Sequence, residues 1–143
     1  MITTNNCLKT LSDKKIKSIL ISISRVMLAL YFFLPGVSKF IFWDMHIILM
    51  ETHNMAMAPL LLAITGATQI FGSIFLLLNK WVVAWALTFA AMVLLINLNL
   101  HDFWNIYEGV DARHETQNFV KNLGIFAGLV ALAAVSMKGP SSS

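Results

Sequence analysis

The residues best suited to chemistry gather in one stretch, residues 100–124, which reads LHDFWNIYEGVDARHETQNFVKNLG. His101 stands beside Asp102, and histidine is the side chain that exchanges protons near neutral pH. Lys121, near the end of the stretch, adds a positive charge that attracts anions. Long apolar runs flank the stretch on both sides. It is therefore either a water-facing connection between two buried helices or a place where the protein acts.

Three further polar residues lie within or at the edge of the apolar runs: Arg25, Lys39 and Gln69. A charge within a membrane span is costly and usually faces other helices or water. Arg25 and Gln69 are each about nine residues from one end of their run, which places both roughly 13 Å deep. We therefore expect a hydrogen bond between these two side chains.

These residues predict a cationic, histidine-containing mouth over a helical bundle. Lys39, His101 and Lys121 would form its rim, with Arg25 and Gln69 deeper. His101 would transfer a proton, and the other four would contact a quinone or a small anion. Structural alternatives stay open: lipid anchoring for the lysines, a structural hydrogen bond for Arg25, and a helix-capping role for His101.

Several kinds of built-in site are excluded by residue counts and spacing. Cys7 is the only cysteine, so an internal disulfide, a CxxC pair and a cysteine-held iron–sulfur cluster are excluded. The four histidines lack the spacing of a metal motif, and we predict no metal site. There is no phosphate-binding glycine loop or dinucleotide motif. We expect no built-in cofactor, so redox chemistry would need a borrowed one, such as a quinone.

The composition indicates a membrane protein. Of the 143 residues, 58% are hydrophobic and only 12% are charged, whereas a soluble domain carries roughly 25% charged residues. Much of the surface must therefore face lipid. The net charge of +3 comes from cationic residues spread along the chain, so we expect no nucleic-acid partner.

Four apolar runs are long enough to cross a hydrocarbon core of roughly 30 Å. They predict an all-α integral membrane four-helix bundle in a single domain, residues 16–137. Asp44 to Met57 predicts a short helix lying in the interface, with a loose loop as the alternative. We expect residues 1–15 to form a cytoplasmic tail and residues 138–143 a disordered one. The four predicted spans cover residues 16–37, 58–78, 81–100 and 119–137.

The distribution of lysine and arginine predicts the orientation. Basic residues predominate before the first span, in the turn at 79–80 and after the last span, whereas acidic residues predominate in the other two connections. Both termini should therefore be cytoplasmic. The first run is too long for a signal peptide and lacks a small-residue cleavage site, so we expect it to be retained.

Each predicted span carries a stripe of small or polar residues at three- and four-residue steps. The fourth includes the close-packing pattern Gly124-x-x-x-Gly128, which allows a neighbouring helix to approach. The stripes are Ser18, Ser22, Arg25, Ala29, Gly36 and Lys39; Thr65, Gln69 and Ser73; Ala86, Ala90, Asn97 and His101; and Lys121, Gly124, Gly128, Ala131 and Val135.

The ordered set of short motifs resembles the DoxX family. The motifs are Arg25, FFLPGVSKF with the Gly-x-x-Lys of Gly36 and Lys39, TQIFGS, HDFWN and NFVKNLGIFAG. The resemblance runs from Arg25 to Ala133 and implies a four-helix protein of the bacterial inner membrane. Some relatives are small membrane subunits of a thiosulfate:quinone oxidoreductase. Relatives often carry a glutamate where Gln69 stands, and glutamine cannot titrate, which puts a proton relay there in doubt.

Two functions follow from the residues and the resemblance together. One is a small membrane subunit of a quinone-linked redox assembly, with a redox protein as its partner. The other is a non-catalytic anchor or scaffold that holds a partner enzyme, or a second copy of the chain, at the membrane. Transport of a small solute is a third. Whether the chain is itself an enzyme stays open.

Overall fold

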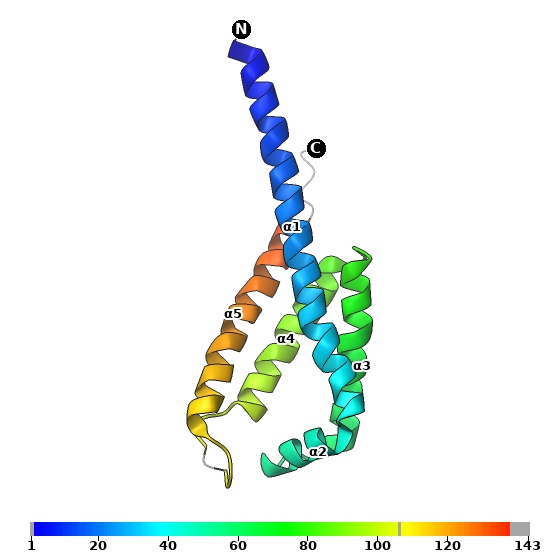
Figure 1. The fold of residues 1–143 in the computed structure, drawn as a ribbon, viewed down its shortest axis with the longest axis vertical. Coiled ribbons are helices and arrows are strands. Elements are labelled where there is room, and N and C mark those ends of the chain that lie inside the picture. Colours follow the sequence, from blue (N-terminus) through cyan, green and yellow to red (C-terminus); the bar gives the residue numbers. More distant parts are fainter. Residues whose placement is uncertain (1, 106, 138–143) are drawn as a thin grey trace.

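Five helices make up the part of the chain that the computed structural model describes, residues 2–105 and 107–137, with side chains from Leu11 onward (Figure 1). Four of them are long and apolar enough to cross a membrane, and α2 is short. The predicted all-α membrane bundle, with a short helix after the first span, is confirmed. The helices are α1 (Ile2–Ile41), α2 (Trp43–Thr52), α3 (Ala58–Leu77), α4 (Val82–Leu100) and α5 (Ala112–Ser136).

The two ends of the bundle differ in construction (Figure 1). At one end, which we call the α2 end, α2 lies beside residues 101–105 and 107–111, which connect α4 to α5. At the other, the turn end, residues 78–81 join α3 to α4 and the N-terminal part of α1 projects beyond the other helices. Charged and polar side chains occur at both ends.

Two helices begin earlier than hydropathy predicts. α1 starts at Ile2 rather than near Ile16, so its 40 residues extend about 60 Å. α5 starts at Ala112 rather than near Phe119, because the Asp111 side chain caps it by accepting a hydrogen bond from the Arg113 N–H at 2.9 Å. The added residues of both helices are mostly polar. Polar residues shorten the apolar run that hydropathy detects, but they can still form a helix. The predicted tail at 138–143 lies outside the described residues.

The helices associate mainly as two pairs, α1 with α3 and α4 with α5, and α3 touches α4 much less. Gly36 lets α1 come close to α3, since a Cβ there would lie 2.9 Å from Cβ of Gln69. The rings of Phe32 and Phe89 stack with centroids 4.2 Å apart and join the two pairs. This pairing leaves room between α3 and α4.

Most of the apolar surface of the spans lies outside the core. In the most hydrophobic part of each span no more than 33% of the residues are buried, and large side chains such as Leu34, Phe71 and Leu95 are more than half exposed. An apolar surface of this extent is stable only against lipid. The chain is a multi-pass membrane protein that contacts the bilayer.

Beyond the exposed Ser18, the small-and-polar stripes on α1, α3 and α4 face inward, with buried members that include Ala29, Gln69 and Asn97. The stripe on α5 does not: Gly124 and Gly128 face outward, and a Cβ added to either would meet no atom within 4 Å. α5 instead buries the face made of Asn122, Leu129, Leu132 and Ala133.

A hydrogen bond explains the face that α5 buries. Asn122 donates from Nδ2 to Oδ1 of Asn97 at 2.7 Å, and Asn97 donates to the Phe119 carbonyl at 3.1 Å. A polar amide costs several kcal/mol if it is left without a partner in lipid. Glycine and alanine tolerate either environment, so the asparagine pair decides which side of α5 turns inward.

Candidate functional site

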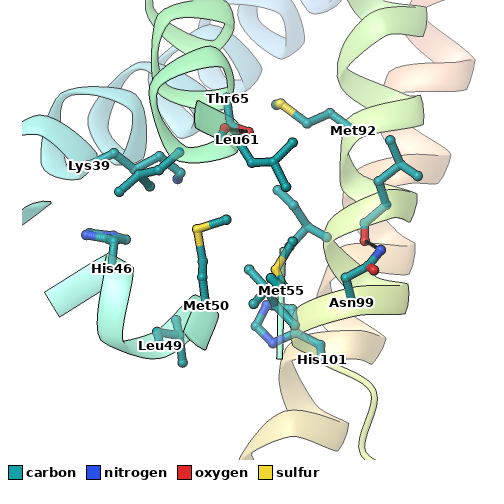
Figure 2. A pocket seen from close by; sticks show the side chains of 14 residues that line it. Lys39, His46, Leu49, Met50, Met55, Leu61, Thr65, Met92, Asn99 and His101 are labelled. Atoms are coloured by element: carbon teal, nitrogen blue, oxygen red, sulfur yellow. Dashed lines mark hydrogen bonds between the residues drawn. The ribbon is translucent and has the colours of Figure 1, made fainter. Parts of the chain in front are cut away.

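A cavity of about 450 Å³ lies at the α2 end, between α1, α2 and α3 on one side and α4 on the other (Figure 2). Its size is that of a small-molecule site, and most of its lining is apolar. The lining residues are Lys39, His46, Leu49, Met50, Met55, Leu61, Leu62, Thr65, Met92, Leu95, Ile96, Asn99, Leu100 and His101.

The fold creates this cavity in two ways. The sparse contact between α3 and α4 leaves a gap, and α2 closes the gap at its end by packing on α3 and α1. Met50, Met55 and Met92 supply flexible, polarizable side chains that adapt to a planar ligand. Figure 2 shows Lys39 and His46 on one side of the cavity and Asn99 and His101 on the other.

His101 is held by a carboxylate from α5. Its Nδ1 lies 2.5 Å from Oε2 of Glu115, and both side chains are largely buried. An ionised carboxylate only accepts hydrogen bonds, so Nδ1 carries the hydrogen and Nε2 remains for a ligand. This arrangement suits a group that gives and takes a proton.

Lys39 and His46 provide the polar groups on the other side of the cavity. Nδ1 of His46 lies 2.8 Å from the Phe42 carbonyl, which can only accept, so Nε2 is again the free nitrogen. Across residues 11–105 and 107–137, no carboxylate lies within ion-pair distance of Lys39. Lys39 therefore brings a positive charge to a mostly apolar space.

A second polar cluster ties α2 to the loop beyond α4. Oδ2 of Asp102 accepts hydrogen bonds from Tyr107 Oη at 2.7 Å and from Asn105 Nδ2 at 2.6 Å, and Asp102 is only 5% exposed. His53, buried on the α2 side, places Nε2 4.0 Å from Oδ1 of Asp102 and its ring 4.4 Å from that of Tyr107. The cluster fixes the helix that covers the cavity.

The electrostatics of this cluster favour the ionised carboxylate. Burial raises the pKa of Asp102, but the hydrogen bonds from Tyr107 and Asn105, its own backbone N–H and the nearby His53 together lower the pKa below its usual value. The hydrogen bond to Asp102 raises the pKa of the Tyr107 hydroxyl. Tyr107 therefore stays protonated as the donor.

The model of the DoxX family matches residues 20–102, which is more than half of the chain. The chain belongs to the DoxX family. No curated protein and no solved structure is similar enough to count as a match. In this DoxX chain the matched region contains α1 from Leu20 onward, α2, α3 and α4, and so every residue that lines the cavity.

The structure brings together two of the five sequence-predicted site residues. Lys39 and His101 line the cavity of this DoxX protein. Gln69 is buried between α3 and α1, and Lys121 is exposed on α5. Arg25 lies at the turn end, in a separate hollow. A site at the cavity can therefore use Lys39 and His101 but not the other three.

The prediction of a hydrogen bond between Arg25 and Gln69 is wrong. Arg25 donates from Nη1 to the Leu76 carbonyl at 2.5 Å and to the Leu77 carbonyl at 3.2 Å. It therefore lies level with the end of α3, where helix carbonyls lack partners. The depth estimate assumed that Ile16 is level with the end of α3, whereas it is Arg25 that lies at this level and residues 16–24 project beyond it. Within the described residues, Oε1 of Gln69 is buried without a hydrogen-bond partner.

Two residues of the site are absent from the sequence predictions. Glu115 is 14 residues from His101 and falls within a predicted connection, so only the early start of α5 reveals the pair. The spacing of His46 from the other histidines gives no sign of its place in the cavity. In the described part of the chain, no three histidine, cysteine, aspartate or glutamate side chains are grouped as metal ligands would be.

Proposed function

We propose that the cavity binds the head of a quinone and that the chain is a small membrane subunit of a quinone-linked redox assembly in the bacterial inner membrane. The observation that carries the proposal is the His101–Glu115 pair at the edge of an apolar cavity, with Lys39 and His46 opposite. Membership of the DoxX family supports a redox setting. An apolar cavity within a bilayer selects a lipid-soluble ligand.

The polar groups match the chemistry of a quinone. Reduction to a quinol adds two electrons and two protons, and both protons go to the former carbonyl oxygens. When protonated at both nitrogens, His101 would donate one of them from Nε2 and regain it from water, while Glu115 holds the ring through Nδ1–H. The second proton would come from water. Lys39 would stabilise the negative charge that develops on the other oxygen. The electrons would come from a partner redox protein.

The charge distribution supports an orientation with both termini cytoplasmic and the α2 end facing the periplasm. Lys14, Lys15, Lys17 and Lys80 lie at the turn end, whereas the α2 end carries most of the acidic residues. A proton taken up or released at His101 would then exchange with the periplasmic side.

The test compares matched variants, with a short-tailed benzoquinone as the probe. Lys39→Met should weaken binding of the probe to purified protein about tenfold, the effect of losing a charged hydrogen bond, whereas Lys121→Met should not change it. His101→Ala should abolish quinone reduction by the assembly, and His114→Ala, an exposed control, should not. Equal effects within each pair would contradict the proposal, as would native protein that binds no quinone.

A second candidate, the anchor or scaffold, is favoured by the outward face of α5. Gly124 and Gly128 leave open space on the lipid side, which allows close approach by another helix. Gly128→Leu would fill this space without disturbing the bundle. Loss of a co-purifying partner from this variant, together with unchanged behaviour of His101→Ala, would support the scaffold instead of the quinone site.

A further inference from the structure

A second hollow, of about 280 Å³, lies at the turn end, at the opposite end of the bundle from the cavity. It forms where α1 passes the turn between α3 and α4. The residues that line it are Lys14, Lys17, Ser18, Ile21, Ser22, Arg25 and Asn79.

Six of the seven lining residues can donate hydrogen bonds. They are three cations, two hydroxyls and one amide; the seventh is the apolar Ile21, and the lining holds no carboxylate. The α1 members recur at three- and four-residue steps, so they share one face of the helix. Asp13, the nearest acidic residue in the sequence, is exposed and does not line the hollow. This set of donors matches an anion with several acceptor oxygens.

The guanidinium of Arg25 lies at the base of the hollow and is held in place by hydrogen bonds. Its Nη1 is bonded to the carbonyls of Leu76 and Leu77, which holds the guanidinium at the end of α3. A guanidinium has five N–H groups, so donors remain for a ligand after these bonds are made. Arginine forms planar, forked contacts with phosphate oxygens, which lysine alone cannot form.

The position of the hollow is that of lipid headgroups. Arg25 is level with the last residues of α3, and Lys17 lies about 12 Å farther out along α1. Trp81, beside the turn, is 69% exposed, as expected of an aromatic side chain at the membrane interface.

We propose that this hollow is a binding site for the phosphate group of an anionic glycerophospholipid. Arg25 and Ser22 hold the phosphate oxygens at the base, and Lys14 and Lys17 close over the headgroup from farther along α1. A headgroup without its own cation fits, because the lining offers no carboxylate to pair with a choline or an amine. The site is independent of the quinone cavity at the opposite end.

The test measures lipid selectivity in the full-length protein, exchanged into mixed micelles with equal phosphatidylglycerol and phosphatidylcholine. Native mass spectrometry should show preferential retention of phosphatidylglycerol. In the double variant K14Q/K17Q the ratio of bound phosphatidylglycerol to bound phosphatidylcholine should fall about thirtyfold, since each lysine near the surface contributes about a factor of five. The matched control K15Q/K80Q removes the same charge from residues that do not line the hollow, and should lose far less.

A second variant keeps the charge constant. S22L should fill the base of the hollow and lower the preference while leaving every cation in place. An equal loss in K14Q/K17Q and K15Q/K80Q, or an unchanged preference in S22L, would overturn the proposal by showing that total charge alone acts. Displacement of the lipid by millimolar inorganic phosphate would assign the hollow to a free phosphate and overturn the lipid assignment.

Discussion

Oε2 of Glu115, on α5, lies 2.5 Å from Nδ1 of His101, which follows the end of α4 and lines the cavity. The carboxylate fixes both the hydrogen position and the direction of the imidazole ring. A free histidine at a loop would lose this orientation to ring rotation. The pair therefore joins the sequence's best proton-transfer candidate to a residue from a separate helix.

Replacing Glu115 with glutamine tests this relationship. Glu115→Gln keeps a side chain that can bond to Nδ1 but removes the charge that stabilises the imidazolium. Quinone reduction should fall about tenfold or more, with less than a threefold change in quinone affinity. Steady-state kinetics of the assembled complex separates the two. Glu108→Gln, at an exposed loop position, is the control, and a similar loss there would show that the effect is not specific to the pair.

The same substitution at Gly36 and at Gly124 tests the packing of α1 against α3, with Gly124 as the exposed control. A Cβ at Gly36 would lie 2.9 Å from Gln69 Cβ and 3.2 Å from the Ile70 backbone nitrogen, so Gly36→Ala should push α1 from α3 and cost about 1–3 kcal/mol. Gly124→Ala meets no atom within 4 Å and should leave stability unchanged or slightly raised. Unfolding in mixed micelles measures both. A stable Gly36→Ala variant would show that the two helices are not tightly packed.

Asp102 predicts an acid limit to stability. Its pKa is lowered in the folded chain, so the stability it contributes is complete above the ordinary value of 3.8 and is lost as the pH falls through the lower folded value. Thermal unfolding from pH 6 to pH 2 should show this loss. In Asp102→Asn the loss should shrink, with a cost of about 1–3 kcal/mol at neutral pH. Asp13→Asn, at an exposed position, should reproduce the native curve.

The orientation can be read from cysteine labelling. In a Cys7→Ser background, a cysteine at Glu108 should react with a membrane-impermeant maleimide in intact cells. A cysteine at Asn79, exposed at the turn end, should react only after the membrane is opened. The reverse pattern would place the α2 end in the cytoplasm and separate His101 from the periplasm.

Much of the fold follows from the sequence because hydropathy acts locally. The four spans follow from the length of the apolar runs, and the helix at Trp43–Thr52 and the inward faces of α1, α3 and α4 follow from periodicity. The burial of Gly36 also agrees with its place in a family motif. These features depend on residues a few positions apart, which a reader of the sequence can compare directly.

The remainder depends on contacts between distant segments. The inward face of α5 was missed because the Asn97–Asn122 bond decides it, and neither residue alone indicates a partner. Glu115 was missed for the same reason. Hydropathy also gives no helix boundary outside the membrane, and it does not give the register of α1 against α3, which places Arg25 at the end of α3.

The length of α1 has a consequence for any protein that approaches this side of the membrane. The residues before Arg25 continue as a helix for about 35 Å beyond the level where α3 ends. A soluble enzyme cannot lie flat on the bilayer across that rod. It must stand beside the rod or have a groove to receive it, which restricts the angle at which it can dock on this side of the membrane.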